Sequence, residues 1–243
     1  MFKIHVYKTV DEVSQKAFEI VRDIVKVDHP VTLGLATGSS PIGMYARLVE
    51  DHEKNGTSYA HVTTYNLDEY VGLPVGHQQS YLSFMNENLF DYVNISRKNI
   101  HMPSAHSKDL KKNAEEYSQA VLNAHVDVQV LGVGSNGHIG FNEPGTPFDS
   151  ITHVVALKDE TRQDNARFFN ALDEVPEYAV SMGITEIMAA KKIVLIAIGN
   201  KKALAVKEMI QGKIREEVPA TILQKHPDVV LILDEEAAKL LHD

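Results

Sequence analysis

The chain has 243 residues, no cysteine and a formal net charge of −9 at pH 7. With 44% hydrophobic and 23% charged residues, it has the composition of a folded protein rather than a disordered one, and its length suits one large α/β domain or two small ones. The lack of cysteine excludes disulfides, cysteine-ligated metals and thiol nucleophiles, and the acidic balance disfavours a nucleic-acid partner.

In chain order, the expected elements alternate between short strands rich in β-branched residues and amphipathic helices. Up to residue 134, strands are expected at 3–8, 31–37, 61–70 and 126–134, and helices at 10–26, 40–54, 79–91 and 107–123. In the helix at 40–54, Ser40 is the expected N-cap. Pro41 takes the first helical position, where a helix leaves the N–H unpaired in any case.

Later strands are expected at 152–158, 192–199 and 228–234, and helices at 200–210 and 235–241 follow the last two directly. Several strands lack the polar–apolar alternation of a half-exposed strand, which indicates a mostly parallel sheet covered by helices on both faces. The sequence contains no repeat, low-complexity tract or linker. We therefore expect an α/β fold in a single domain spanning residues 1–243.

The apolar runs of the sequence are short. One of the longest, IVLIAI at 193–198, is far below the length of a membrane span. The first residues, MFKIHVYKTVDE, do not combine a basic region with an apolar core as a signal peptide does. We expect no membrane partner and a cytoplasmic location.

Four segments follow strands, where open α/β sheets bind their ligands: ATGSSP (36–41), NLDEY (66–70), GVGSNGHIGFNEPG (132–145) and GNKKA (199–203). In the first, Gly38 lets the backbone approach a ligand. The N–H groups near Ser39 and Ser40 lie at the positive end of a helix dipole, which suits phosphate or sulfate. An ordinary strand-to-helix turn is the alternative. The segment is neither a P-loop nor a dinucleotide fingerprint, so ATP and NAD gain no support.

The segments NLDEY and GNKKA each place two like charges side by side. Only one of Asp68 and Glu69 can face a cleft, and a carboxylate there could act as a general base; a solvated pair is the alternative. Lys201 and Lys202 oppose the dipole of the helix that follows, which makes sense where an anion binds. A chance surface arrangement is the alternative.

The segment SNGHIGFNEPG is the most specific of the four. His138 is suited to moving protons at neutral pH, and the glycines around it permit turns that bring Glu143 close enough to orient the imidazole. Asn136 could bond the substrate or fix the His tautomer. No second His or acid follows at helical spacing, so no metal is expected, and Ser135 lacks the frame of a hydrolase nucleophile. A purely structural loop is the alternative.

Five stretches of the sequence carry a family resemblance: LGLATGSSP, NLDEYVGL, GVGSNGHIGFNEPG, TRQDNARFF and GNKKALAV. In this order and spacing, the chain from about residue 30 onward resembles the glucosamine-6-phosphate deaminases of the glucosamine/galactosamine-6-phosphate isomerase family. The resemblance implies a modified Rossmann-like sheet in one α/β domain. It also implies conversion of glucosamine 6-phosphate and water to fructose 6-phosphate and ammonia, without cofactor or metal.

The resemblance assigns roles to the motif residues. His138 is implied as the acid and base that opens the sugar ring, with Glu143 orienting it. Asp68 is implied as the base that moves the C2 proton to C1. The phosphate is expected at a second group of residues, namely Gly38, Ser39, Ser40, Arg167 and Lys202.

Three departures from the larger family members bear on function. Asn136 stands where those members have Asp, so Glu143 is the expected charged partner of His138, and Asn136 is a candidate catalytic or structural residue. His153 and Val155 stand where the resemblance places an Arg and a Lys of an effector site. The chain also ends at Asp243, without the family's C-terminal extension. We expect a short, non-allosteric type of deaminase.

Three other functions remain possible from the sequence. A 6-phosphogluconolactonase would share the fold but needs no base at C2, so the NLDEY carboxylate disfavours it. A galactosamine-6-phosphate deaminase differs by the orientation of one hydroxyl group, which the motifs do not report. A sugar-phosphate sensor of a transcription regulator would carry a DNA-binding segment ahead of this sheet, and here the first expected strand begins near residue 4.

Overall fold

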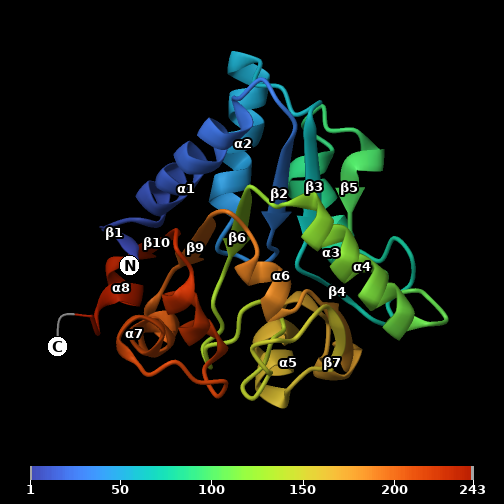
Figure 1. The fold of residues 1–243 in the computed structure, drawn as a ribbon, viewed down its shortest axis with the longest axis vertical. Helices are drawn as coiled ribbons and strands as arrows, with labels where there is room; N and C mark the ends of the chain where they lie inside the picture. The colour runs from blue at the N-terminus through green and yellow to red at the C-terminus, as the bar shows by residue number, and fades with distance from the viewer. Residues whose placement is uncertain (1, 242–243) are drawn as a thin grey trace.

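The central sheet consists of seven parallel strands in the order β1-β10-β9-β6-β2-β3-β5 (Figure 1). The computed structural model describes residues 2–241, apart from the side chains at positions 164 and 168. The strands of this sheet are β1 (Lys3–Tyr7), β2 (Val31–Leu35), β3 (Val62–Asn66), β5 (Ile100–His101), β6 (Val128–Leu131), β9 (Ile193–Ala197) and β10 (Val229–Asp234). Every residue of β6, β9 and β10 is buried, which explains why these strands show no alternation in sequence.

A second, antiparallel sheet of three strands lies beside the first, in the order β4-β8-β7. It contains β4 (Asp68–Tyr70), β7 (His153–Ala156) and β8 (Tyr178–Ser181). The single strand expected at 61–70 is therefore two strands in two sheets, separated at Leu67. The Leu67 N–H donates to the Leu35 carbonyl of the central sheet at 3.1 Å, and the Leu67 carbonyl accepts from the backbone N–H of Met182, just after β8, at 2.6 Å. Leu67 is therefore hydrogen-bonded to both sheets, and the chain crosses from one to the other at this residue.

The helices connect the strands and cover the central sheet. They are α1 (Val10–Val25), α2 (Ile42–Asn55), α3 (Tyr81–Met85), α4 (Leu110–Ala124), α5 (Asp159–Asn165), α6 (Ile184–Met188), α7 (Ala203–Gln211) and α8 (Glu235–Ala238). Right-handed crossovers place α1 and α2 on one face and α4 and α7 on the other, and α1 packs against α2. In Figure 1, α1 and α2 occupy the upper part of the view and α5 and α7 the lower part.

Short helical turns complete the secondary structure. They are η1 (Asn86–Phe90, π-helical) and five 3-10 turns, η2 (Arg97–Asn99), η3 (Ala166–Phe168), η4 (Leu172–Glu174), η5 (Asn200–Lys202) and η6 (Pro219–Lys225). Two predicted helix starts need correction. Helix α2 begins at Ile42 with Pro41 as N-cap, so Ser40 precedes the cap, and the lysines before α7 belong to η5. Residues at a helix end often have α-like dihedral angles without the helical hydrogen bonds, so the start of a helix commonly shifts by one or two positions.

The order of the strands determines where a ligand can bind. After β2 the chain continues outward to β3 and β5, and then returns to place β6 on the other side of β2. Open α/β sheets bind ligands beyond the carboxyl ends of their strands at such a reversal. The loops after β2 and β6 meet at this reversal, and those after β9 and β3 flank them.

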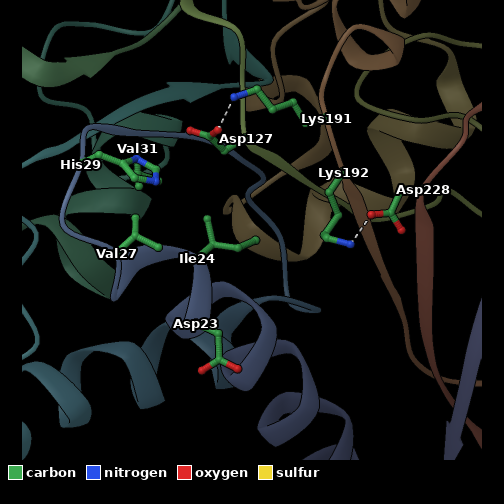
Figure 2. Close-up of a pocket in the computed structure, with 9 residues that line it drawn as sticks. All are labelled: Asp23, Ile24, Val27, His29, Val31, Asp127, Lys191, Lys192 and Asp228. Atoms are coloured by element: carbon green, nitrogen blue, oxygen red, sulfur yellow. Dashed lines mark hydrogen bonds and ion pairs between the residues drawn. The ribbon is translucent and has the colours of Figure 1, made fainter.

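The opposite, amino edge of the sheet is held by ion pairs between neighbouring strands. A hollow of about 320 Å³ lies there, beside the starts of β2, β6, β9 and β10, and Figure 2 shows the residues that line it. Lys191 bonds Asp127 at 2.7 Å, and Lys192 bonds Asp228. The charges in this hollow are paired within the fold, so we do not place the functional site there. Among the described residues, none of the helices has the length and apolar character of a membrane span.

Candidate active site

The loop after β6 wraps tightly around the His138 ring. Gly134 N donates to the His138 carbonyl at 2.9 Å, and Gly137 N donates to the Gly134 carbonyl at 3.0 Å. A Cβ placed on Gly134 would lie 2.4–2.5 Å from three ring atoms of His138, and Gly137 has a φ of +86°. The glycines therefore serve two purposes: one lets the imidazole lie against the backbone, and the other supplies a left-handed turn.

Glu143 is the nearest charged partner of His138. Its Oε2 lies 3.6 Å from His138 Nδ1, which is longer than a hydrogen bond. Nδ1 is buried and has no hydrogen-bond partner among the described residues. The spacing is that of a close electrostatic contact, which suits an imidazole oriented by a carboxylate.

Both Glu143 oxygens accept hydrogen bonds. Asn136 Nδ2 donates to Oε2 at 3.0 Å, and Thr161 Oγ1 donates to Oε1. Burial by itself would raise the pKa of Glu143, but the His138 imidazole, Thr161 and Asn136 outweigh it and lower the pKa to about 2. Glu143 is therefore an anion at neutral pH, as a residue that stabilises an imidazolium must be.

Asn136 also helps to shape the loop itself. Its Oδ1 accepts from the His138 backbone N–H at 3.1 Å while its Nδ2 holds Glu143. The amide thus bridges the backbone of one candidate catalytic residue and the side chain of another. This geometry supports positioning by Asn136, and no hydrogen bond from it to the imidazole ring is seen among the described residues.

Asp68 and Glu69 differ sharply in their surroundings. Burial, with a smaller effect of the neighbouring Glu69 charge, raises the pKa of Asp68 to about 8. A Cβ placed on Gly140 would lie 3.8 Å from Asp68 Oδ2 and 3.2 Å from Ser181 Oγ. Asp68 therefore lies under the His138 loop, in an environment where its carboxyl can exchange a proton near neutral pH.

Glu69 has a structural role. Its carboxylate accepts backbone N–H bonds from Tyr70, Tyr81 and Leu82 at 2.8–2.9 Å, which holds the start of α3 against β4. The two carboxylates point in different directions, as adjacent strand residues do. Of the two carboxyl groups, that of Asp68 is therefore the candidate general base.

A cluster of aromatic side chains lies next to Asp68. The Tyr70 side chain lies on the same side of β4 as Asp68, and its hydroxyl accepts a hydrogen bond from the Tyr81 hydroxyl at 3.2 Å. Phe141 of the His138 loop lies 5.9 Å from the Tyr70 ring, and Phe169 lies 5.8 Å from it. Burial, and to a smaller extent the Asp68 charge, raise the pKa of Tyr70 and of Tyr81, so the cluster lies within electrostatic range of Asp68.

The residues predicted to bind phosphate lie on three segments. Gly38 follows β2 with a φ of +92° and open space at its Cβ position, Ser39 is exposed and Ser40 is half-buried. Lys202 is half-buried in η5, directly after β9. Because β9, β6 and β2 are neighbours, their carboxyl ends bring Gly38 and Lys202 to opposite sides of the His138 loop.

Arg167 comes from a segment that is not a strand end of the central sheet. It is exposed on η3, directly after α5. Two contacts hold this segment against the His138 loop: Thr161 bonds Glu143, and Lys158 Nζ donates to the Pro144 carbonyl at 3.0 Å. The structure thus places Arg167 on a segment attached to the site, and its part in phosphate binding stays a prediction.

Sequence reasoning missed two contacts of this site. Thr161 belongs to the TRQDNARFF stretch, but nothing in its spacing links it to Glu143, eighteen residues earlier. Ser181, whose Oγ accepts from Phe141 N at 3.0 Å, lies on β8, a strand that was not expected. No group of three His, Asp or Glu suited to a metal ion occurs among the side chains that the structure describes.

Comparison with protein families gives a match over nearly the whole chain. Residues 7–231 match the family described as glucosamine-6-phosphate isomerases/6-phosphogluconolactonase. A glucosamine-6-phosphate deaminase of Clostridium botulinum (strain Alaska E43 / Type E3) is 48% identical over 241 residues, covering 99% of this chain and 97% of the relative. One of Thermoanaerobacter pseudethanolicus is 46% identical, with 99% and 96% covered.

Solved structures give the same result for the fold. A monomeric glucosamine-6-phosphate deaminase superposes with a TM-score of 0.96 at 42% identity, covering 98% of this chain and 99% of that one. A 6-phosphogluconolactonase from Trypanosoma brucei superposes with a TM-score of 0.79 at 19% identity, with 99% of each chain covered. The second likeness concerns the fold alone. The expected modified Rossmann-like α/β fold with a mostly parallel sheet is confirmed.

Proposed function

We propose, from the premise that the chain belongs to the family of glucosamine-6-phosphate isomerases and 6-phosphogluconolactonases, that it is a glucosamine-6-phosphate deaminase. The reaction converts glucosamine 6-phosphate and water to fructose 6-phosphate and ammonia. Relatives of this name are 46–48% identical over almost the full chain. The substrate is thus a small sugar phosphate, and its amino sugar identity follows from these relatives.

One structural observation favours the deaminase over a lactonase. The buried Asp68 carboxyl, with a pKa raised to about 8, lies under the same loop as the His138–Glu143 pair. Hydrolysis of a lactone requires no proton abstraction from carbon, whereas isomerisation of an aldose requires a base at C2. A carboxyl group that changes protonation state near neutral pH is suited to that task.

The first step of the proposed mechanism opens the sugar ring. His138 takes the proton of the anomeric hydroxyl group and delivers it to the ring oxygen, which breaks the bond between C1 and that oxygen. Glu143 is held as an anion by its hydrogen bonds and stabilises the imidazolium during this transfer. Asn136 bonds both the His138 backbone N–H and the Glu143 carboxylate, and so fixes their positions relative to each other.

The second step moves a proton between carbons. Asp68 takes the proton from C2 of the open-chain sugar, the electron pair shifts onto the C1 carbonyl, and the carbonyl oxygen takes a proton from water. The Asp68 carboxyl exchanges its proton with water and then protonates C1, while the nitrogen releases a proton to water and forms a double bond to C2. The product is an imine at C2. Water adds to the imine carbon and the amine leaves as ammonia, which gives the C2 ketone of fructose 6-phosphate.

The phosphate group is the expected anchor of the substrate. Backbone N–H groups around Gly38, Ser39 and Ser40, together with Arg167 and Lys202, supply the local positive potential that a chain of net charge −9 otherwise lacks. Arg suits bidentate contact with phosphate and Lys acts as a point charge. We further propose that the enzyme works in the cytoplasm.

The test of this function is product analysis with purified protein. Glucosamine 6-phosphate should yield ammonia and fructose 6-phosphate in equal amounts. Galactosamine 6-phosphate and 6-phosphogluconolactone serve as parallel substrates, because they separate the epimer-specific and lactonase alternatives. Lactone hydrolysis without ammonia release would refute the proposal.

A further inference from the structure

The carboxylate of Glu143 is held by two different parts of the chain. Oε2 accepts from Asn136 within the His138 loop and faces the imidazole. Oε1 accepts from Thr161 Oγ1 of α5. Thr161 is 4% exposed and Glu143 is 4% exposed, so water has little access to replace the Thr161 hydroxyl.

The orientation of this carboxylate needs a second contact. The terminal torsion of a Glu side chain has broad energy wells, so a single bond from Asn136 leaves the carboxylate plane poorly fixed. The 3.6 Å contact between Oε2 and His138 Nδ1 depends on that plane. Bonding Oε1 from the opposite side fixes both oxygens at once.

We propose that Thr161 is a positioning residue, which holds Glu143 with Oε2 towards His138 and thereby sets the orientation of the imidazole. This inference rests on the proposed deaminase function. Thr161 acts through Glu143, so removal of the Thr161 hydroxyl should slow ring opening without weakening the binding of the substrate phosphate.

The attachment of α5 to the loop supports this role. Lys158, the N-cap residue of α5, donates to the Pro144 carbonyl at 3.0 Å, next to Glu143 in sequence. The first turn of α5 is therefore fixed to the loop at two points, one of which is the Thr161 hydroxyl. A hydroxyl at the end of a fixed helix turn is a well-defined donor, as a positioning residue requires.

The same chain contains a matched contact outside the site. Thr152 Oγ1 donates to Glu186 Oε1 at 2.8 Å, and these residues are 2% and 1% exposed. This pair has the same buried hydroxyl–carboxylate bond as Thr161–Glu143, with a further bond from Thr152 N to Glu186 Oε1 at 2.7 Å, and Glu186 forms no ion pair with a His among the described residues. It allows the loss of a buried Thr–Glu bond to be measured without the loss of positioning.

The experiment compares kcat and KM of wild type, Thr161→Val, Thr161→Ser and Thr152→Val for glucosamine 6-phosphate. Thr161→Val should lower kcat by about 10- to 100-fold, the range that a misplaced catalytic group produces, with little change in KM. Thr161→Ser keeps the hydroxyl and should restore most of kcat. Thr152→Val should keep the wild-type kcat even where its melting temperature falls.

A double variant tests whether Thr161 acts through Glu143. In a Glu143→Gln background, adding Thr161→Val should cause no further loss of kcat; independent, multiplying losses would overturn the proposal. If the valine variant does not fold, Thr161→Ala against Thr161→Ser isolates the hydroxyl, and equal kcat values would overturn it. An inactive wild type would refute the proposed function itself, whereas an active wild type matched by a folded Thr161→Val refutes this inference alone.

Discussion

Asp68 and Glu69 are adjacent in sequence, but the fold gives them opposite tasks. Glu69 is satisfied by three backbone N–H groups, whereas Asp68 is buried without a hydrogen bond to its carboxyl among the described residues. The sequence predicted that one of the two faces the site. Only the folding of α3 back onto β4 shows which one, because two of the three donors to Glu69 come from residues twelve and thirteen positions later.

The raised pKa of Asp68 predicts the pH dependence of activity. A general base must be ionised, so kcat/KM should rise with pH and level off above about 8. The measurement is kcat/KM between pH 6 and 9 at constant ionic strength. A flat profile across this range, in the absence of a pH-dependent fold, would contradict the assignment.

The same pKa predicts a change in stability. Between the ordinary value of 3.8 and about 8, the folded protein holds a proton on Asp68 that the unfolded chain releases. The free energy of unfolding should therefore fall as pH rises through this interval. Asp68→Asn removes this loss, so the variant should be more stable than wild type at pH 8 and about equally stable at pH 4, as urea denaturation can show.

Gly134 tests the placement of His138. A Cβ at Gly134 would lie 2.4–2.5 Å from the ring, whereas one at Gly132 meets nothing within 4 Å. Gly134→Ala should displace the imidazole and lower kcat by about 100-fold, and Gly132→Ala should leave kcat unchanged. Circular dichroism checks that both variants fold. A Gly134→Ala enzyme with wild-type kcat would show that the ring position is not critical.

At the scale of elements, the site is assembled from the loops after β2, β6 and β9, from strand β4, which follows β3, and from the α5–η3 segment. The segments after β2, β3, β6 and β9 were predicted from sequence, because strand ends with Gly, Asp, His and Lys stand out against apolar runs. The split at Leu67 and the strand β8 were not. Both depend on pairing with residues distant in sequence, such as Leu67 with Met182, which local patterns do not report.

The segments carrying Arg167 and Lys202 predict how the substrate is held. Arg167→Ala and Lys202→Ala should each weaken substrate binding by roughly 1.5–3 kcal/mol, the range for hydrogen bonds to charged groups, with a smaller effect on kcat. Lys201→Ala is the matched control, since Lys201 is an exposed neighbour in the same η5 turn.

The measurement is KM for glucosamine 6-phosphate, beside kcat/KM for unphosphorylated glucosamine. The two site variants should lose most of the wild-type preference for the phosphorylated sugar, and the control should keep it. Equal catalytic efficiency of the wild type with and without the phosphate would remove the anion-site assignment.

At the scale of the whole molecule, the reversal of strand order between β2 and β6 explains why the site forms where it does. The sequence predicted the alternation of strands and helices, and thereby the fold class. It did not predict the second sheet, because β7 and β8 lie on either side of α5 and pair with each other across more than twenty residues. That second sheet supplies the surface on which Asp68 and the His138 loop meet.

The second sheet also bears on regulation. His153 and Val155 of β7 stand where the family resemblance places two cations of an effector site, and neither side chain offers the permanent charge by which Arg binds phosphate. We expect hyperbolic kinetics and no activation by N-acetylglucosamine 6-phosphate. Initial rates across a substrate range, with and without this sugar, decide the matter. A sigmoidal curve that the effector makes hyperbolic would show that an effector site exists elsewhere.

The central claim, that Asp68 moves the C2 proton in a deaminase reaction, is tested most directly in deuterated water. Wild type and Asp68→Asn are each incubated with glucosamine 6-phosphate, and ammonia and the deuterium in the recovered sugars are measured by NMR and mass spectrometry. We predict that wild type releases ammonia and forms fructose 6-phosphate carrying solvent deuterium at C1. Asp68→Asn should still bind the sugar phosphate but neither release ammonia nor exchange hydrogen. Exchange at the wild-type rate in the folded variant would contradict the account.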